Sequence, residues 1–226
     1  AYGSFGYMDN TGTLKGQSYK RYNGNVSVDI APNKWFSMGA NLNTSYGVNE
    51  YGQSTVGRSA VASSGGIYQT ARQNLPYAMP FDANGVRIIN PGGDSTIRNV
   101  YDEHLYSQDQ RVTLRAFGSF YAQLDLGAIS SKLDGLKYRV NFGPDITAYR
   151  NGVFLDGQSS ARSGTSYASL SKDQTISYTL DQLLFYNKTL GNHNFGLTLL
   201  QSQTQYRNEG NAMSAEKIPN AANKWN

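Results

Sequence analysis

The 226-residue sequence contains no cysteine and little of several other residue types on which protein chemistry depends. Without cysteine it can form neither a disulfide scaffold nor a thiolate metal site. No run of 18 apolar residues is present, which excludes membrane-spanning helices. Charged residues make up only 16% of the chain, whereas an ordinary soluble domain has about 25%.

These absences exclude several classes of function. The sequence has no G-x-S-x-G, phosphate-binding loop, dinucleotide fingerprint or H-E-x-x-H motif. Its only two histidines, His104 and His193, lie in unrelated contexts far apart in the chain. The basic residues are scattered and the net charge is only +4, which argues against nucleic acid as a partner. We therefore predict that the protein is not an enzyme and needs no cofactor and no metal.

What the sequence does have is a long-range alternation of apolar and polar residues. Between residues 36 and 48 the even positions are apolar except Thr44, and the odd positions are all small or polar. A period of two is typical of a strand with one apolar and one polar face. The same pattern predicts about seven antiparallel strands, at residues 1–9, 17–31, 35–49, 110–126, 136–156, 174–190 and 194–208.

These strands are too long for an ordinary globular sheet, where about 5–6 residues is usual. Fifteen residues at about 3.3 Å each and a tilt of about 40° rise nearly 40 Å, which exceeds the ~25 Å apolar band of an outer-membrane barrel. The chain offers no helices to cover so long an apolar face, whereas lipid could. Pro144 interrupts one strand, and because alternation resumes in register at Ile146 we predict a bulge there.

The connections between the predicted strands alternate between short and long. Residues 30–35, 127–135 and 190–193 form short turns, whereas 9–16, 51–108 and 156–172 form long loops. This is the layout of an all-β, antiparallel up-and-down transmembrane β-barrel segment with periplasmic turns and long extracellular loops. The 51–108 stretch is too long to be structureless, so we predict a functional excursion with a short helix at 66–73 and turns at 82–85 and 90–93.

The alternation assigns side chains to two environments. Lipid-facing side chains are expected at the even-numbered strand positions from Tyr22 through Tyr186 and at 195–199. They include Phe36, Met38, Leu42, Val112, Leu114, Leu124, Val140, Phe142 and Leu184. Lumen-facing charges are expected on the odd rows at Arg111, Arg115, Lys137, Arg139 and Asp145, although a water-solvated sheet face would carry the same residues. Candidates for interfacial aromatic girdles are Tyr7, Tyr22, Trp35, Tyr46, Tyr138 and Tyr186.

The excursion contains candidate contacts for a solute or a lid protein. They are aromatic or polar residues of the loop, namely Tyr68, Tyr77, Phe81, Asp82, Asn84, Asp102 and Glu103. A packed loop explains the aromatic residues equally well, and a solvated pair is the default interpretation of Asp102 and Glu103. Residues 82–85 resemble half of a calcium loop, but Pro91 stands where the acidic ligand would be, so a turn with Gly85 at positive φ is favoured.

Three segments resemble SusC/RagA-like TonB-dependent outer-membrane transporters. Residues 12–35 (GTLKGQSYKRYNGNVSVDIAPNKW) are similar to an early barrel hairpin of that family. Residues 71–85 (ARQNLPYAMPFDANG) are similar to its Pro-x-x-x-Pro-x-(Tyr/Phe)-Asp-x-x-Gly loop. Residues 133–141 (LDGLKYRVN) are similar to the opening of a later strand, and the three pieces occur in the family's order.

The resemblance implies that this chain, residues 1–226, is a partial TonB-dependent receptor barrel domain. The full protein would be a plugged barrel of about 22 strands, with the plug and the remaining strands outside this chain. It would import glycan fragments or peptides across the outer membrane of a Gram-negative, Bacteroidetes-type cell. Its partners would be a SusD-like surface lipoprotein, outer-membrane lipid and, through regions absent here, the TonB complex.

Two alternatives remain open at this point. A siderophore or cobalamin receptor of the TonB-dependent type would obey the same barrel physics. A soluble β-sandwich that binds carbohydrate or mediates adhesion belongs to a different class. It would have shorter strands and two packed sheets, with the rows that begin at Phe36 and Val112 meeting in a core.

Overall fold

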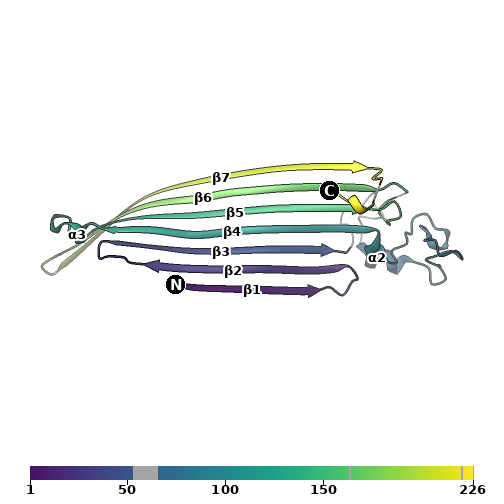
Figure 1. Cartoon of the computed structure of the whole chain (residues 1–226), viewed down its shortest axis with the longest axis horizontal. Helices are drawn as coiled ribbons and strands as arrows, with labels where there is room; N and C mark the ends of the chain where they lie inside the picture. The colour runs from purple at the N-terminus through teal and green to yellow at the C-terminus, as the bar shows by residue number, and fades with distance from the viewer. Residues whose placement is uncertain (53–65, 163, 220, 226) are drawn as a thin grey trace.

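The computed structural model describes residues 1–52, 66–162, 164–219 and 221–225, and within them the chain forms one sheet of seven strands. Each strand pairs antiparallel with its neighbours in sequence, so the order across the sheet runs from β1 to β7 (Figure 1). The strands are β1 (Tyr2–Thr11), β2 (Gln17–Ile30), β3 (Phe36–Tyr51), β4 (Ser107–Asp125), β5 (Leu136–Leu155), β6 (Tyr167–Leu190) and β7 (His193–Glu216). The predicted all-β, up-and-down architecture is confirmed.

Two of the strands are longer than the alternation predicts. β6 begins at Tyr167 and β7 ends at Glu216, and these two residues pair with each other. The predicted loop 156–172 is therefore reduced to residues 156–166. Apolar residues are sparse in the two added segments, so the pattern is weak there, whereas the backbone groups of both strands still satisfy each other.

Short links gather at one end of the sheet and long links at the other (Figure 1). We call the end with the short links the turn end and the opposite end the loop end. At the turn end β6 and β7 are joined by residues 191–192, and the β4–β5 link contains α3 (Leu126–Ile129) and η3 (Ser131–Leu133). At the opposite, loop end, the β3–β4 excursion contains α2 (Gly66–Gln73), η1 (Pro91–Gly93) and η2 (Glu103–Leu105). A last turn, η4 (Ala221–Asn223), follows β7. The short helix and the alternation of links agree with the sequence prediction.

The helices of the chain are short. Among the described residues, no helix combines the length and the apolar character needed to cross a membrane.

Pro144 does not produce the bulge that we predicted. Pairing between β4 and β5 stops at Phe117–Asp145 and resumes at Phe120–Phe142, so two residues on each strand are left out of the pairing between β4 and β5. A bulge would need an extra residue on one strand only. The missing N–H of proline removes a donor without shifting the register, and pairing with β6 continues through Pro144–Tyr178.

The register gives the sheet one apolar face and one polar face. Even-numbered residues of β2 to β6 lie opposite one another across the strands, as in the row Phe36–Leu124–Tyr138–Leu184. In β7 the odd residues join them, because Leu184 pairs with Leu199. The rows that a β-sandwich would bring face to face thus lie side by side in one sheet. The structure rules out that alternative.

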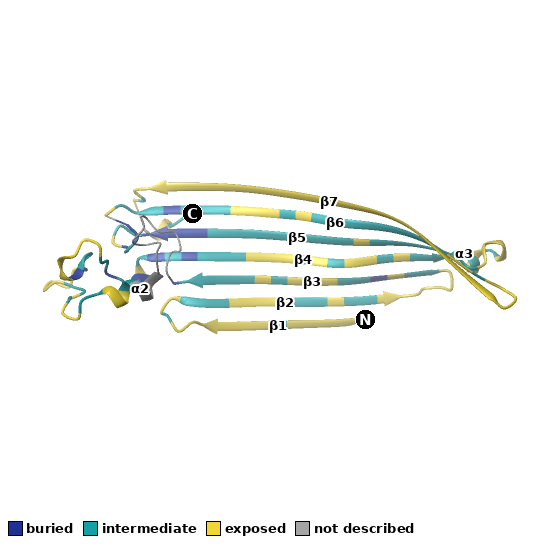
Figure 2. Ribbon diagram, turned by 180° about the vertical axis from the view of Figure 1, so that it is seen from behind, coloured by how far each residue is buried: buried dark blue, intermediate teal, exposed yellow. Residues whose placement is uncertain are grey.

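Burial is concentrated at the loop end (Figure 2). Val153, Leu155 and Ala161 form a small cluster, against which Tyr167 packs. Along most of the sheet, by contrast, large apolar side chains are exposed: Leu42 is 37% exposed and Leu114 is 47% exposed. In the part of the chain that the structure describes, no apolar core runs along the strands, and a long apolar face is left uncovered.

Candidate functional site

The apolar face is bounded by two sets of aromatic residues. Near the loop end Tyr7, Tyr22 and Tyr46 lie opposite one another on adjacent strands. Their ring centroids are 4.9 Å and 6.3 Å apart. Near the turn end the apolar face carries Phe36, Tyr138 and Tyr186, with Trp35 beside Phe36 at 5.9 Å between centroids.

The separation of these two sets matches the thickness of an apolar membrane band. Phe36 and Tyr46 are ten residues apart on β3. Ten residues at about 3.4 Å each, tilted by about 40°, give roughly 26 Å of height, against ~25 Å for the outer band of a membrane barrel. Every residue that we predicted to face lipid lies on this face of the sheet: Phe36, Met38, Leu42, Val112, Leu114, Leu124, Val140, Phe142 and Leu184.

The last strand departs from this pattern. On β7 the apolar face continues with Leu197 and Leu199, opposite Tyr186 and Leu184, and is then polar from Gln201 to Asn211. This change occurs on the strand itself and does not reflect a shift in pairing, because the register with β6 is unbroken from His193 to Glu216.

The opposite, polar face carries arginines stacked on aromatic rings. Arg111 lies over Tyr51 at 4.2 Å from the ring centroid, and Arg139 lies over Tyr121 at 4.1 Å. Arg115 lies over Phe117 at 4.8 Å. Such stacks hold a guanidinium in place while its edges stay available for hydrogen bonds.

Phe117 and Tyr121 break the alternation of β4, and the stacking explains why. Both are odd-numbered, so their rings share the polar face with the arginines. An aromatic residue on a polar face contradicts the period-two pattern but provides a platform for a cation. The signal was present in the sequence as two exceptions to the pattern, each with an arginine on the same or the next strand.

All five charges predicted to face the lumen lie on this polar face, and each has a partner. Arg115 binds Asp145 through two hydrogen bonds of 3.1 Å and 2.6 Å. Lys137 pairs with Asp125 at 3.0 Å, Arg139 donates to Asn141, and Arg111 contacts Asp109 at 3.3 Å. The face is therefore an ordered array of paired charges that could offer donors and acceptors to a polar solute.

The loop end is organised by a buried ion pair that the sequence did not reveal. Arg87 and Glu103 meet at 2.8 Å, with side chains only 1% and 3% exposed. Arg87 also donates to the carbonyl oxygens of Asn99 and Gln158 and lies over the ring of Tyr106 at 4.4 Å. A buried charge is tolerated only when it is paired and hydrogen-bonded in this way.

Glu103 extends the same network to the β5–β6 loop. Its carboxylate accepts from the hydroxyl of Ser159 at 2.6 Å and from the backbone N–H of Ser160 at 3.0 Å. Our interpretation of Asp102 and Glu103 as a solvated pair is therefore wrong for Glu103. The two residues have different environments because the side chain of Asp102 points to Lys15 and stays 26% exposed.

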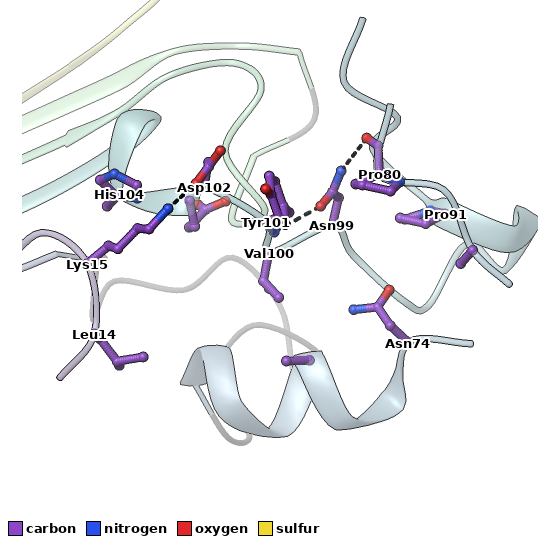
Figure 3. Close-up of a pocket in the computed structure, with 13 residues that line it drawn as sticks. Leu14, Lys15, Asn74, Pro80, Pro91, Asn99, Val100, Tyr101, Asp102 and His104 are labelled. Carbon is purple, nitrogen blue, oxygen red and sulfur yellow. Dashed lines mark hydrogen bonds and ion pairs between the residues drawn. The ribbon is translucent and has the colours of Figure 1, made fainter. Parts of the chain in front are cut away.

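A pocket of about 520 Å³ lies beside this network, between the β1–β2 link, α2 and residues 99–104 (Figure 3). Its wall is largely apolar and is formed in part by Leu14, Ala71, Ala78, Pro80, Pro91, Val100 and Tyr101. Lys15 and Asp102 form an ion pair at 3.6 Å across it. Asn74 also lines it, and the side-chain oxygen of Asn74 is buried without a hydrogen-bond partner among the described residues.

The predicted loop contacts are not all in this pocket. Asp102 and Glu103 line it, whereas Tyr77 is 73% exposed outside it. Phe81 packs edge-on against Tyr101, with ring centroids 5.6 Å apart. The side chain of Tyr68 lies outside the described residues. A role for these residues in binding a solute or a lid protein stays a prediction.

Asp82 and Asn84 form the expected turn. One oxygen of the Asp82 carboxylate accepts from the backbone N–H groups of Asn84 and Val86 at 2.9 Å and 2.8 Å, and Gly85 has φ +76°. The next turn has Gly92 and Gly93 at positive φ. In the part of the chain that the structure describes, no group of three or more acidic or histidine side chains is placed to hold a metal.

Asp94 is a fixed anion near the same turn. The hydroxyl and the backbone N–H of Thr96 donate to it at 2.7 Å and 2.8 Å. These hydrogen bonds stabilise the charged form and hold the pKa of the Asp94 carboxyl below its usual range.

Comparison with known proteins gives a curated relative and a set of solved structures. The chain is 26% identical over 210 residues to TonB-dependent receptor P3 of Formosa agariphila, a match that covers 92% of this chain and 20% of the relative. The chain therefore spans about a fifth of the length of that relative. No protein-family model matches it.

The solved structures share the fold. The RagAB peptide transporter matches with a TM-score of 0.70 at 18% identity over 97% of this chain and 24% of the other. The RagAB peptide importer in its closed-closed state matches with a TM-score of 0.61 at 20% identity over 95% of this chain and 23% of the other. These are receptors and transporters by name, not enzymes, and the predicted resemblance to SusC/RagA-like TonB-dependent transporters is confirmed.

Proposed function

From this resemblance we propose that the chain is part of an outer-membrane, TonB-dependent importer of peptides or glycan fragments. The observation that carries the proposal is the sheet itself. From β2 to β6 the sheet has one continuous apolar face about as tall as a membrane and one polar face with ordered charges. In this proposal the apolar face contacts outer-membrane lipid and the polar face lines the lumen.

The solute would be captured at the loop end. There the excursion and the β5–β6 loop are fixed to each other by Arg87 and Glu103, so they can present a stable surface. A SusD-like surface lipoprotein would close over these loops as a lid. Release into the lumen would follow a rearrangement of the plug driven by the TonB complex, through regions outside this chain.

Peptides are favoured over glycan fragments as the solute. The solved structures with this fold are described as a peptide transporter and importer. The polar face also suits a peptide, because Arg115 and Asp145 together offer donors and acceptors of both charge signs to backbone groups and termini.

The lipid-facing assignment can be tested in the full-length protein by cysteine labelling. Leu42→Cys and Leu114→Cys place a thiol on the apolar face, and Asn43→Cys and Thr113→Cys place one on the adjacent position of the polar face. A water-soluble maleimide applied to outer membranes should label the second pair at least about tenfold faster, because lipid shields the first pair. Equal labelling of both pairs would show that the apolar face is not in lipid.

The solute class can be tested with the same protein and its lid lipoprotein. Cells that express the wild-type pair should deplete a mixed pool of short peptides from the medium faster than cells that lack the transporter, and should leave oligosaccharides unchanged. Depletion of oligosaccharides alone would assign the importer to glycan fragments. Depletion of neither would contradict the proposed import function.

A further inference from the structure

A hollow of about 380 Å³ opens on the apolar face near the loop end, across β4 to β7. Its side toward the middle of the sheet is apolar, with Val112, Leu114 and Ala148. Its outer side carries Arg150 and Lys172. This is where the apolar face changes from hydrocarbon-like to charged.

Arg150 and Lys172 are neighbours by register. They lie directly opposite each other on β5 and β6, and Val112 lies opposite Arg150 on β4. Arg150 donates to the side chain of Gln110, but its Nε is buried and lacks a hydrogen-bond partner among the described residues. Lys172 is exposed and has no ion-pair partner within the same part of the chain.

The two acidic residues of the hollow do not neutralise this pair. Asp173 is at an odd-numbered position of β6, which belongs to the polar face, and it lies opposite Gly210 on β7. Glu209 lines the hollow from β7, but it accepts a hydrogen bond from Arg207 Nε at 2.9 Å. Arg150 and Lys172 therefore carry positive charge for which the described residues supply no carboxylate. Such a pair is costly unless water or an anion from outside the chain contacts it.

A third cation, Lys20, lies in register with Arg150 and Lys172 and can be compared with them. Lys20 on β2 lies opposite Val48, which lies opposite Val112, so Lys20 is in register with Arg150 and Lys172. The ammonium of Lys20, unlike that of Lys172, pairs with Asp9 at 3.4 Å. Among the described residues, Lys20 of this row thus has a carboxylate partner, whereas Arg150 and Lys172 have none.

The position of Arg150 along its own strand indicates what that partner is. On β5 Arg150 lies two residues beyond Ala148, which lines the apolar side of the hollow. Two tilted residues correspond to roughly 5 Å, and the headgroup layer of a bilayer extends about 5–7 Å beyond the hydrocarbon on each side. Arg150 is therefore within the headgroup layer if the apolar face is in the membrane, and Lys172 is its direct neighbour on β6.

We infer that Arg150 and Lys172 bind the phosphate of an anionic lipid headgroup in the outer leaflet, with acyl chains lying on Val112, Leu114 and Ala148. Charge-assisted hydrogen bonds from a guanidinium and an ammonium suit a phosphate, and basic residues beside a membrane span attract anionic lipids. The inference rests on the proposed function, because it requires the apolar face to contact lipid.

The test compares retained lipid in variants of the full-length protein. Wild type, the double variant Arg150→Gln/Lys172→Gln and the control Lys20→Gln are reconstituted in phosphatidylcholine nanodiscs with and without lipid A, and bound lipid A is measured by mass spectrometry. We expect the double variant to bind lipid A on the order of tenfold more weakly. Lys20→Gln should bind like wild type, because Lys20 already has a carboxylate partner.

Two further experiments test whether the charges alone are needed and whether the ligand is a lipid rather than free phosphate. Arg150→Lys/Lys172→Arg keeps both charges and should retain most of the binding. Inorganic phosphate, added as a competitor, should displace little lipid A, because it cannot use the apolar part of the hollow. Complete displacement by inorganic phosphate, or equal binding by wild type and the double variant, would overturn the inference.

The outcome is separable from that of the proposed function. If the thiols at positions 42 and 114 are protected from the maleimide and the double variant still binds lipid A normally, only the lipid site is wrong. If those thiols are labelled freely, the membrane orientation fails, and the lipid site fails with it.

Discussion

At the scale of single residues, the ion pairs of this chain differ in how far they are buried. On the polar face they are exposed, as with Arg115 and Asp145, whose side chains are 50% and 36% exposed. At the loop end Arg87 and Glu103 are almost fully buried. Exposed pairs contribute little to stability. Loss of one member of a buried pair is costly, because it leaves an uncompensated charge.

This difference makes Arg87 the residue on which the loop end depends. Arg87→Met should destabilise the excursion locally by about 3–5 kcal/mol, because Glu103 would stay buried without a counter-charge. Hydrogen exchange of residues 80–106 and 156–162 in the full-length protein measures the effect. The double variant Arg87→Met/Glu103→Leu should exchange more slowly than the single variant. Equal exchange in both would show that the orphaned charge is not the cause.

At the scale of elements, the loop end depends on how closely the β1–β2 link approaches the end of β3. Gly16 and Gly52 both have positive φ, at +82° and +65°. A side chain at Gly52 would meet the carbonyl carbon of Gly16 and the carbonyl oxygen of Lys15, both at 2.8 Å. The absence of a Cβ thus lets Lys15 reach Asp102 at the pocket.

Gly52→Ala should therefore displace the β1–β2 link and break the contact between Lys15 and Asp102. The control is Gly85→Ala, which has a similar backbone, with φ +76°, but no atom within 4 Å of the added carbon. Both variants carry a strain of about 1–3 kcal/mol, but only Gly52→Ala should speed proteinase K cleavage within residues 12–16. If both variants are cleaved equally, backbone strain rather than the close approach explains the effect.

At the scale of the whole molecule, the sheet has two open edges. Within the described residues β1 pairs only with β2, and β7 pairs only with β6 (Figure 1). Unpaired edges are incompatible with a bilayer, because lipid cannot satisfy backbone N–H and C=O groups. A membrane sheet must therefore continue at both edges until it closes.

Hydrogen exchange in the full-length protein tests this closure. If further strands pair with both edges, amides of β1 and β7 should exchange as slowly as those of β4 at the middle of the sheet. The same chain expressed alone and refolded in detergent should exchange much faster at β1 and β7 than at β4. Fast exchange at either edge of the full-length protein would contradict a closed barrel.

The sequence predicted the strands and the local turns of the loops but not the contacts between the loops, for a physical reason. Period-two alternation is a local property, so Phe36 and Leu114 could be assigned to one face before any pairing was known. Pro144 misled the prediction, because a missing donor does not by itself require an extra residue. Glu103 and its buried partners Arg87 and Ser159 have no sequence spacing that would connect them, because a long-range hydrogen-bonded network is set by where two loops meet.

By itself, the sequence determined that the chain forms strands with one apolar face, because successive side chains on an extended backbone point to opposite faces. Only the tertiary structure decided which residues share a row. The register brings Arg150 next to Lys172 and gives Lys20 the carboxylate of Asp9, although all three cations look alike in the sequence. Pairing between strands fixes these neighbours. Registers that differ by two residues offer the same backbone hydrogen bonds and the same faces, so the alternation determines the face of each residue but not its partner on the next strand.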